Sequence, residues 1–257
     1  MSVLLLALAP SRVCAQTDEI QVYNGNLAAP GVVNLTLHTN YTPAGITIPA
    51  FPGAVVADKS FNQVPEWAYG VAPWFEAGLY LPLYTRDSHM GWGLDGAKLR
   101  LLFAVPRAAD RTFFYGSNFE FSYNTRRWDA TRFTSEIRPI VGWHLRQVDI
   151  IVNPILDTAY DGLKNLEFEP ATRVAYNLTD RWAAAAEEYA DFGQAHRFSA
   201  IGDQSHQLYA VVDRTGTPFD VEVGVGFGLN QSSSRLTLKV ILSRDLRSAK
   251  TSDGPDR

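Results

Sequence analysis

The sequence predicts an all-β fold, namely a transmembrane up-and-down antiparallel β-barrel of about twelve strands. Three observations support this prediction: apolar and polar residues alternate with a period of two, the polar positions carry charges in mid-strand, and long and short connections alternate. The stretch 132–153 shows the pattern best, with apolar positions at Phe133, Ile137, Val141, Trp143, Val148, Ile150 and Val152. Because charges are costly in a dry core, the polar face is expected to line a wet lumen and the apolar face to contact lipid.

Segments with this alternation predict the wall strands in chain order. The expected strands are 34–41, 65–70, 74–83, 92–104, 113–123, 132–143, 148–153, 164–177, 182–190, 206–212, 219–228 and 236–242. The short connections are expected to be periplasmic turns and the long ones extracellular loops, with both ends of the barrel on the periplasmic side. Pro139 falls inside the sixth strand and has no backbone N–H, so a bulge or kink is expected there.

Aromatic residues occur where the two interfacial girdles of a membrane barrel would lie. Trp74, Phe113, Trp143, Trp182 and Phe219 lie at the short-turn ends of their strands, and Tyr84, Trp92, Tyr123 and Phe133 lie towards the long loops. A soluble antiparallel barrel or sandwich would also alternate. Matched charges on one face and large aromatics on the other favour the membrane barrel.

The expected organisation has four parts. Residues 1–15 predict a signal peptide, with a short apolar run and with Val13 and Ala15 before a cleavage point at Gln16. A positively charged start is missing, which leaves open a start upstream of Met1. Residues 16–33 predict a periplasmic lead-in, residues 34–243 the barrel, and residues 244–257 a disordered C-terminal tail.

Composition restricts the classes of function. The net charge is −4 and basic residues are interspersed with acidic ones, which argues against a nucleic-acid binder. The chain contains one cysteine, Cys14, which would leave with the signal peptide. No apolar run is long enough for a transmembrane helix. The expected location is therefore the bacterial outer membrane, with outer-membrane lipid as a partner.

The charged inner face is the best indication of function. The residues expected to line a pore are Lys98, Arg100, Glu120, Arg132, Glu136, Arg138, Glu167, Glu169, Arg173, Glu222, Arg235 and Lys239. They predict either a small pore whose charges select solutes or a barrel filled by cross-strand ion pairs.

Catalysis and metal binding have weaker support. The histidines show no metal-ligand spacing, so neither a metal nor another cofactor is expected. Ser205 and His206 raise the alternative of a lipid hydrolase, but neighbouring residues on a strand point to opposite faces, so His206 would need a serine from another strand.

Several segments resemble a known family: PEWAYGVAPWFEAGLYLPLY, FTSEIRPIVGWHL, ATRVAYNL and LKVILSRDL, among others, spread over nearly all of the mature chain. They resemble the proteobacterial outer-membrane barrels assigned as transporters linked to phenol-degradation pathways. The resemblance implies a barrel that carries a small-molecule solute, with aromatic or hydrophobic compounds as one option, and it implies no binding residues. We therefore expect a passive, non-enzymatic conduit for small molecules. A lipid-modifying hydrolase and a closed structural barrel remain the alternatives.

Overall fold

The computed structural model describes residues 19–246. The predicted signal peptide and nearly all of the predicted tail lie outside the described residues. The wall segments are β1 (Val33–Ala44), β2 (Ser60–Ala72), β3 (Phe75–Asp87), β4 (Gly91–Ala104), β5 (Phe113–Asn124), β6 (Phe133–Leu145), β7 (Val148–Asn153), β8 (Leu156–Thr158), β9 (Glu167–Phe168), β10 (Ala171–Asn177), β11 (Trp182–Asp191), β12 (Ser205–Arg214), β13 (Asp220–Gly228) and β14 (Leu236–Asp245). Two short 3-10 helices, η1 (Ala108–Asp110) and η2 (Leu163–Asn165), lie in connections.

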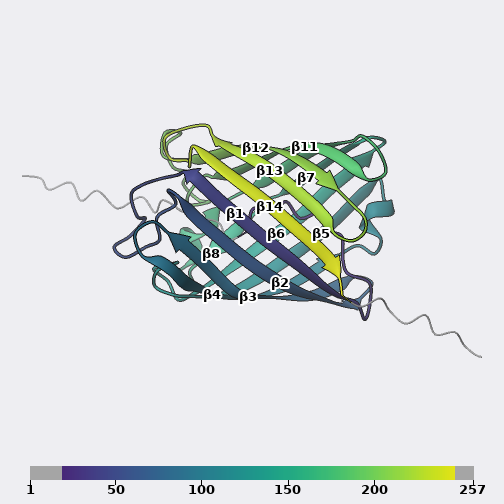
Figure 1. The fold of residues 1–257 in the computed structure, drawn as a ribbon, viewed down its shortest axis with the longest axis horizontal. Helices are drawn as coiled ribbons and strands as arrows, with labels where there is room; N and C mark the ends of the chain where they lie inside the picture. The colour runs from purple at the N-terminus through teal and green to yellow at the C-terminus, as the bar shows by residue number, and fades with distance from the viewer. Residues whose placement is uncertain (1–18, 247–257) are drawn as a thin grey trace, which may run out of the picture.

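These segments form one closed antiparallel barrel (Figure 1). Consecutive strands pair along the chain, and the first wall strand pairs with the last through β1 and β14. Fourteen segments fill twelve wall positions because β7 with β8, and β9 with β10, each share one position. The predicted fold class is confirmed. No helix among residues 19–246 is long and apolar enough to cross a membrane.

The pairing beside Pro139 is interrupted without a change of register. β6 pairs with β7 at Val141 and Val152, and it pairs again with β8 at Ile137 and Leu156. The two pairs are separated by the same number of residues on β6 and on the β7–β8 segment, so the pairing continues in the same register. Pro139 and Pro154 face one another in this gap, and neither can donate a backbone hydrogen bond. The expected irregularity therefore takes the form of a gap between β6 and its neighbour.

Several predicted strand ends need correction. The polar residues after Tyr84 continue the β3–β4 hairpin, so the loop expected at 84–91 shrinks to residues 88–90. β2 begins at Ser60, within a segment expected to be loop. The strand expected over 164–177 begins at Glu167 and is interrupted before β10 at Ala171. Polar side chains are common on an inner wall, so polarity alone misplaced these ends.

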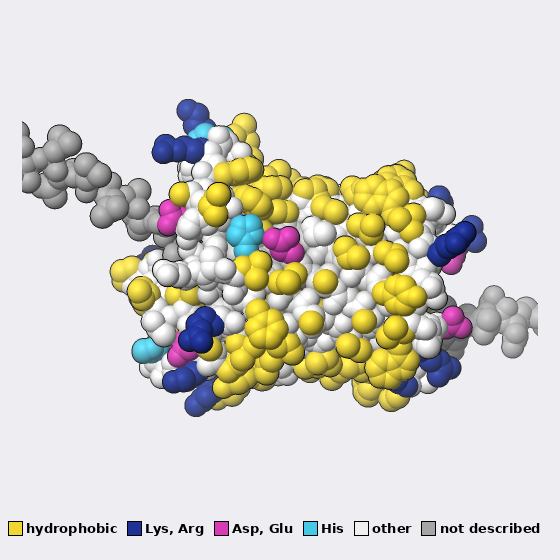
Figure 2. All heavy atoms as spheres, turned by 90° about the horizontal axis from the view of Figure 1, so that it is seen from above, with side chains coloured by type: hydrophobic (Ala, Val, Ile, Leu, Met, Phe, Trp, Pro, Cys, Tyr) yellow, Lys and Arg dark blue, Asp and Glu magenta, His cyan; other side chains and the backbone are white. Residues whose placement is uncertain are grey.

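The outer surface carries the predicted apolar face. Val223 and Ile137 point outward with 45% and 42% exposure, whereas Arg138 is 5% exposed. Large aromatics gather towards both ends of the barrel (Figure 2), and the residues predicted for the girdles at the short-turn end are exposed there: Trp74, Phe113, Trp143, Trp182 and Phe219. The long loops lie at the left end of Figure 1 and the short turns at the right.

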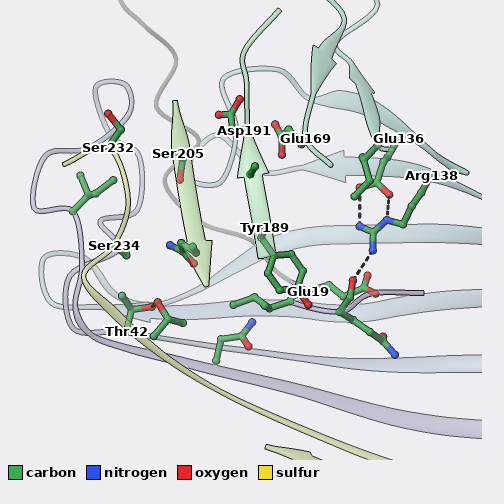
Figure 3. Close-up of a pocket in the computed structure, with 18 residues that line it drawn as sticks. Glu19, Thr42, Glu136, Arg138, Glu169, Tyr189, Asp191, Ser205, Ser232 and Ser234 are labelled. Carbon is green, nitrogen blue, oxygen red and sulfur yellow. Dashed lines mark hydrogen bonds and ion pairs between the residues drawn. The ribbon is translucent and has the colours of Figure 1, made fainter. Parts of the chain in front are cut away.

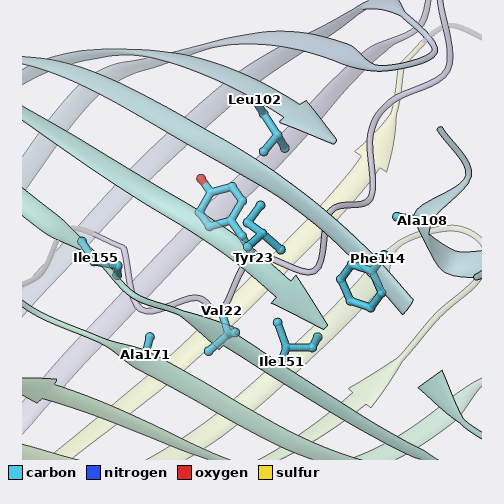
Figure 4. Close-up of a cluster of buried hydrophobic side chains, with 9 residues drawn as sticks. Val22, Tyr23, Leu102, Ala108, Phe114, Ile151, Ile155 and Ala171 are labelled. Carbon is cyan, nitrogen blue, oxygen red and sulfur yellow. The ribbon is translucent and has the colours of Figure 1, made fainter. Parts of the chain in front are cut away.

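The predicted periplasmic lead-in is wrong for the residues that are described. Residues 19–32, here called the strap, run inside the barrel to the start of β1. Val22 and Tyr23 of the strap pack in a buried cluster with Leu102, Phe114 and Ile151 (Figure 4). Burial of these apolar side chains stabilises the strap in the lumen and explains its position.

Gly70 permits the strap to leave the lumen at the short-turn end. A Cβ at this position would collide with the carbonyl oxygens of Ala28 and Ala29. The strap then joins the wall through backbone hydrogen bonds from Gly31 N to Gly70 O (2.8 Å) and from Gly70 N to Val32 O (3.0 Å). The strap is thus continuous with the sheet and fixed at this end.

Candidate functional site

The lumen wall carries two groups of buried ion pairs. In the first group, formed by β2 to β6, Arg100 Nη2 lies 2.5 Å from both Glu66 Oε1 and Glu76 Oε1. Lys98 Nζ lies 2.7 Å from Glu120 Oε2, and Arg138 Nε lies 2.6 Å from Glu136 Oε1. Each of these side chains is at most 15% exposed. Alternation on the strands directs all of them inward.

The second group lies on the wall formed by β10 to β14. Lys239 Nζ, which is fully buried, lies 2.5 Å from Glu187 Oε2 and 2.6 Å from Glu222 Oε1. Arg173 contacts Glu187 and Asp213, and its Nη1 lies 3.6 Å from Glu222 Oε2. Each charged side chain of this second group therefore faces an opposite charge, with two basic and three acidic side chains in contact.

The strap is held between the two walls by polar contacts to its backbone. Lys239 Nζ donates to Ile20 O (3.1 Å), and Arg138 Nη1 donates to Gln21 O (3.0 Å). Asn153 binds the backbone of Tyr23 twice, because its Oδ1 accepts from Tyr23 N (2.7 Å) and its Nδ2 donates to Tyr23 O (3.1 Å). These contacts place the strap across the middle of the lumen.

A chain of hydroxyl contacts adds a third support. The hydroxyl oxygens of Tyr23 and Tyr80 lie 2.6 Å apart, and Tyr80 donates to Glu19 Oε2 (3.0 Å). The Arg138 guanidinium lies 4.8 Å from the centre of the Tyr23 ring. Tyr23 is thereby fixed by its backbone, its ring and its hydroxyl.

The strap separates two cavities. The outer cavity, of about 110 Å³, lies towards the long loops and is bordered by Glu19, Ile20 and Gln21 of the strap (Figure 3). The inner cavity, of about 570 Å³, lies towards the short turns and is bordered by the strap from Gln21 to Ala29. Gln21 borders both cavities, so only the strap's own width separates them here.

Acidic residues form a continuous row on one wall of the outer half of the lumen. Cross-strand pairing places Glu120 opposite Glu136, Glu136 opposite Asp157, and Asp157 opposite Glu167. Like charges directly opposite one another destabilise a sheet. Lys98 and Arg138 balance the first two residues of the row. Among residues 19–246, no basic side chain forms an ion pair with Asp157.

Two further carboxylates, Glu169 and Asp191, border the outer cavity. Glu169 follows β9 in the interruption before β10. The Glu169 carboxyl lies near the negative charges of Asp157, Asp191 and Glu167. The outer cavity is therefore a region where acidic groups predominate.

Most of the residues predicted to line a pore have side chains inside the barrel. They are Lys98, Arg100, Glu120, Glu136, Arg138, Glu167, Glu169, Arg173, Glu222 and Lys239. Their role in a solute path stays a prediction. Two placements were wrong: Arg132 is exposed just before β6, with its guanidinium 5.8 Å from the outward-facing Tyr123 ring, and Arg235 is exposed just before β14. Strand parity does not hold beyond the strand ends, which explains both errors.

The sequence prediction missed several residues of the lumen. Asp157 and Asp191 were assigned to loops, although each continues the inward parity of its strand. Glu19 and the other strap residues were assigned to the periplasm. Asn153 was recognised as a polar position of its strand but gave no signal for a partner more than a hundred residues earlier in the chain. If the inward-outward alternation of the strand had been continued past Pro154, it would have placed Asp157 on the inner face.

Two of the histidines have side-chain partners that are not serines. His206 Nδ1 lies 3.1 Å from Glu188 Oε1, and its Nε2 lies 3.1 Å from Gln204 Oε1, so both ring nitrogens have partners other than a serine. His144 Nδ1 lies 2.7 Å from Asp149 Oδ1 near a short turn. Within residues 19–246, no three His, Cys, Asp or Glu side chains are grouped closely enough to hold a metal ion.

Comparison with known proteins identifies structural neighbours. No protein family model matches the sequence, and no curated protein sequence matches it. The structure is similar to an outer membrane channel from Pseudomonas putida F1, with 13% identity and a TM-score of 0.59, over 88% of this chain and 100% of that chain. It is also similar to the KdgM porin in complex with disordered oligogalacturonate (7% identity, TM-score 0.53, 83% and 99% coverage) and to the NanC porin (8%, 0.51, 82% and 97%).

These neighbours are outer-membrane barrel channels and porins, and at this level of identity they show a shared fold. The closed barrel, the apolar outer face and the two aromatic girdles are the architecture of a protein in the bacterial outer membrane. The resemblance to barrels linked to phenol-degradation pathways stays a prediction.

Proposed function

We propose that the protein is a passive outer-membrane channel for small molecules, without enzymatic activity, and that solutes pass beside the strap. One observation carries this proposal: a cavity lies towards each end of the lumen, and the strap separates the two. The inner cavity reaches Thr215 and Asp220 at a short turn, and the outer one reaches Ile46 and Ser232 at long loops. A small displacement of the strap would join them into one aqueous path.

The structural neighbours give this proposal further support, because three of them are described as a channel and as porins. The charged lumen favours polar or charged solutes, since a narrow path of low surrounding dielectric strengthens the effect of each charge. Outer-membrane lipid would contact the apolar outer face. The solute class implied by the sequence resemblance, aromatic or hydrophobic compounds, has no specific support from the lumen side chains.

A closed structural barrel is the second candidate, and the anchoring of the strap is the observation that favours it. Buried ion pairs on both walls and bonds to the strap backbone would then keep the lumen shut. A lipid hydrolase has less support, because Glu188 and Gln204 occupy both ring nitrogens of His206.

The two candidates are separated by conductance measurements on the purified full chain in planar bilayers, with liposome swelling in small sugars and aromatic acids. A channel gives discrete conductance steps and solute entry above the level of protein-free bilayers. Glu188→Gln, which changes a lipid-facing carboxylate near the same end, is the matched control and should conduct like the wild type. If neither current nor solute entry exceeds the protein-free level, the channel proposal fails and the closed barrel replaces it.

A further inference from the structure

We infer that the outer cavity is a binding site for a small organic cation, an ammonium group carried on a compact apolar body. The inference deepens the proposed channel function and rests on it for a role in transport, although the binding itself can be measured separately. The site consists of Glu19, Glu136, Glu169 and Asp191 around the cavity (Figure 3). Asp157 lies beside Glu136 on the neighbouring strand.

The charged side chains that border this cavity are mostly acidic. Arg138 is the basic residue that borders it, and Arg138 is already paired with Glu136. Within residues 19–246, neither Glu169 nor Asp191 forms an ion pair with a basic side chain; Asp191 Oδ1 accepts a hydrogen bond from Gly193 N (2.7 Å). Carboxylates gathered without basic partners repel one another, and a bound cation would relieve that repulsion.

Glu19 provides a second, independent indication of a ligand. Its side chain belongs to the strap, is 2% exposed and borders the cavity from the side opposite the acidic wall. Tyr80 donates to Glu19 Oε2, but Glu19 Oε1 has no hydrogen-bond partner among the described residues. A buried carboxylate oxygen without a donor is costly. An N–H donor from a bound ammonium would supply the missing hydrogen bond.

The geometry favours an organic cation over a metal ion. No three acidic or histidine side chains of the described chain approach one another as metal ligands would. The carboxylates instead surround a cavity of about 110 Å³ that also contacts Ile20, Ile46 and Ile155. An ammonium group can reach separated carboxylates through several N–H donors, while its carbon atoms contact the isoleucine side chains. This combination fits a small, branched alkylammonium ion.

The test compares tert-butylammonium with its neutral isostere tert-butanol, and with the anion pivalate. Dissociation constants are measured by ligand-observed NMR titration of the detergent-purified full chain at mildly alkaline pH, with empty micelles as the blank. If charge selects the ligand, tert-butylammonium binds at least about tenfold more tightly than tert-butanol, and pivalate binds least. Equal affinity for the ammonium and the alcohol would overturn the inference without requiring any variant.

Substitutions then locate the site. Glu169→Gln combined with Asp191→Asn should weaken tert-butylammonium binding by at least about fivefold and leave tert-butanol unchanged. Glu19→Gln, which alters the strap and not the wall, should also weaken it. Glu188→Gln lies on the same strand as Asp191 but faces lipid, and it should bind like the wild type. Folding of each variant is checked by heat-modifiable mobility in gel electrophoresis.

The outcomes separate this inference from the channel proposal. Selective ammonium binding without any conductance would retain the site and reject the channel. Conductance with no preference among the three probes would retain the channel and reject the site. If both wall and strap variants fold and bind tert-butylammonium like the wild type, the cation is held elsewhere and the inference is wrong.

Discussion

Removal of the Asn153 side chain should loosen the strap selectively. Asn153 is fully buried and makes two hydrogen bonds with the backbone of Tyr23. A typical hydrogen bond contributes about 0.5–1.5 kcal/mol, so Asn153→Ala should lower the free energy of strap detachment by about 1–3 kcal/mol. A change of about 1.4 kcal/mol is a factor of ten, so the detached population should rise by roughly 5- to 150-fold.

Hydrogen exchange of the strap amides measures this change directly. Exchange from the closed strap requires local opening, so its rate should increase by the same factor as the detached population. The barrel strands should keep wild-type exchange, because Asn153→Ala leaves their pairing intact. If the channel proposal holds, bilayer recordings of the same variant should show more frequent or longer openings.

Asn62→Ala is the matched control for this prediction. Asn62 is equally buried on the inner wall, but it donates to Thr85 Oγ1 (2.9 Å) and Tyr84 O (3.4 Å) on β3, and in the described structure it forms no hydrogen bond with the strap. It should leave strap exchange unchanged. Unchanged strap exchange in Asn153→Ala, or an equal increase in both variants, would show that Asn153 does not anchor the strap.

Two further predictions concern the wall and the lumen charges. Val223→Arg should impair assembly more than Glu167→Gln, because an arginine facing mid-bilayer lipid costs roughly 2–4 kcal/mol, and the folded fraction on unboiled gels tests the ranking. Arg138→Ser should leave the fold intact but shift the reversal potential under a salt gradient towards cation preference, since it frees Glu136 and the Gln21 carbonyl; an unchanged potential would contradict this.

The barrel could be predicted because the sequence of each strand alone indicates which side chains face lipid and which face the lumen. A period of two on each strand gives the face of each residue, so Val223, Ile150 and Arg138 could be assigned without knowledge of their neighbours. This alternation does not apply beyond the ends of a strand, so Arg132 and Arg235, which precede β6 and β14, were misplaced. Prolines had a similar effect: they suggested a loop from Pro154 onwards, although the wall position continues through β8.

The strap was not predictable because its partners are distant in sequence. Ile20, Val22 and Tyr23 resemble a short extended segment that could pair with any strand edge. They are held by hydrogen bonds from Asn153, Lys239 and Arg138. In the sequence, each of these three residues has the pattern of an ordinary lumen residue. Side-chain bonds to the backbone of an irregular segment leave no periodic pattern.

Whether a charged lumen residue forms an ion pair indicates its role better than its charge alone does. Lys239 and Arg173 each contact two or more carboxylates of the wall, and Lys239 also donates to Ile20 O of the strap. Within residues 19–246, Glu169 and Asp191 beside the outer cavity form no ion pair with a basic side chain. A barrel that needed only to stay closed would gain stability from a lysine at either position. The uncompensated acids are therefore where a ligand, rather than the fold, accounts best for the side chains present.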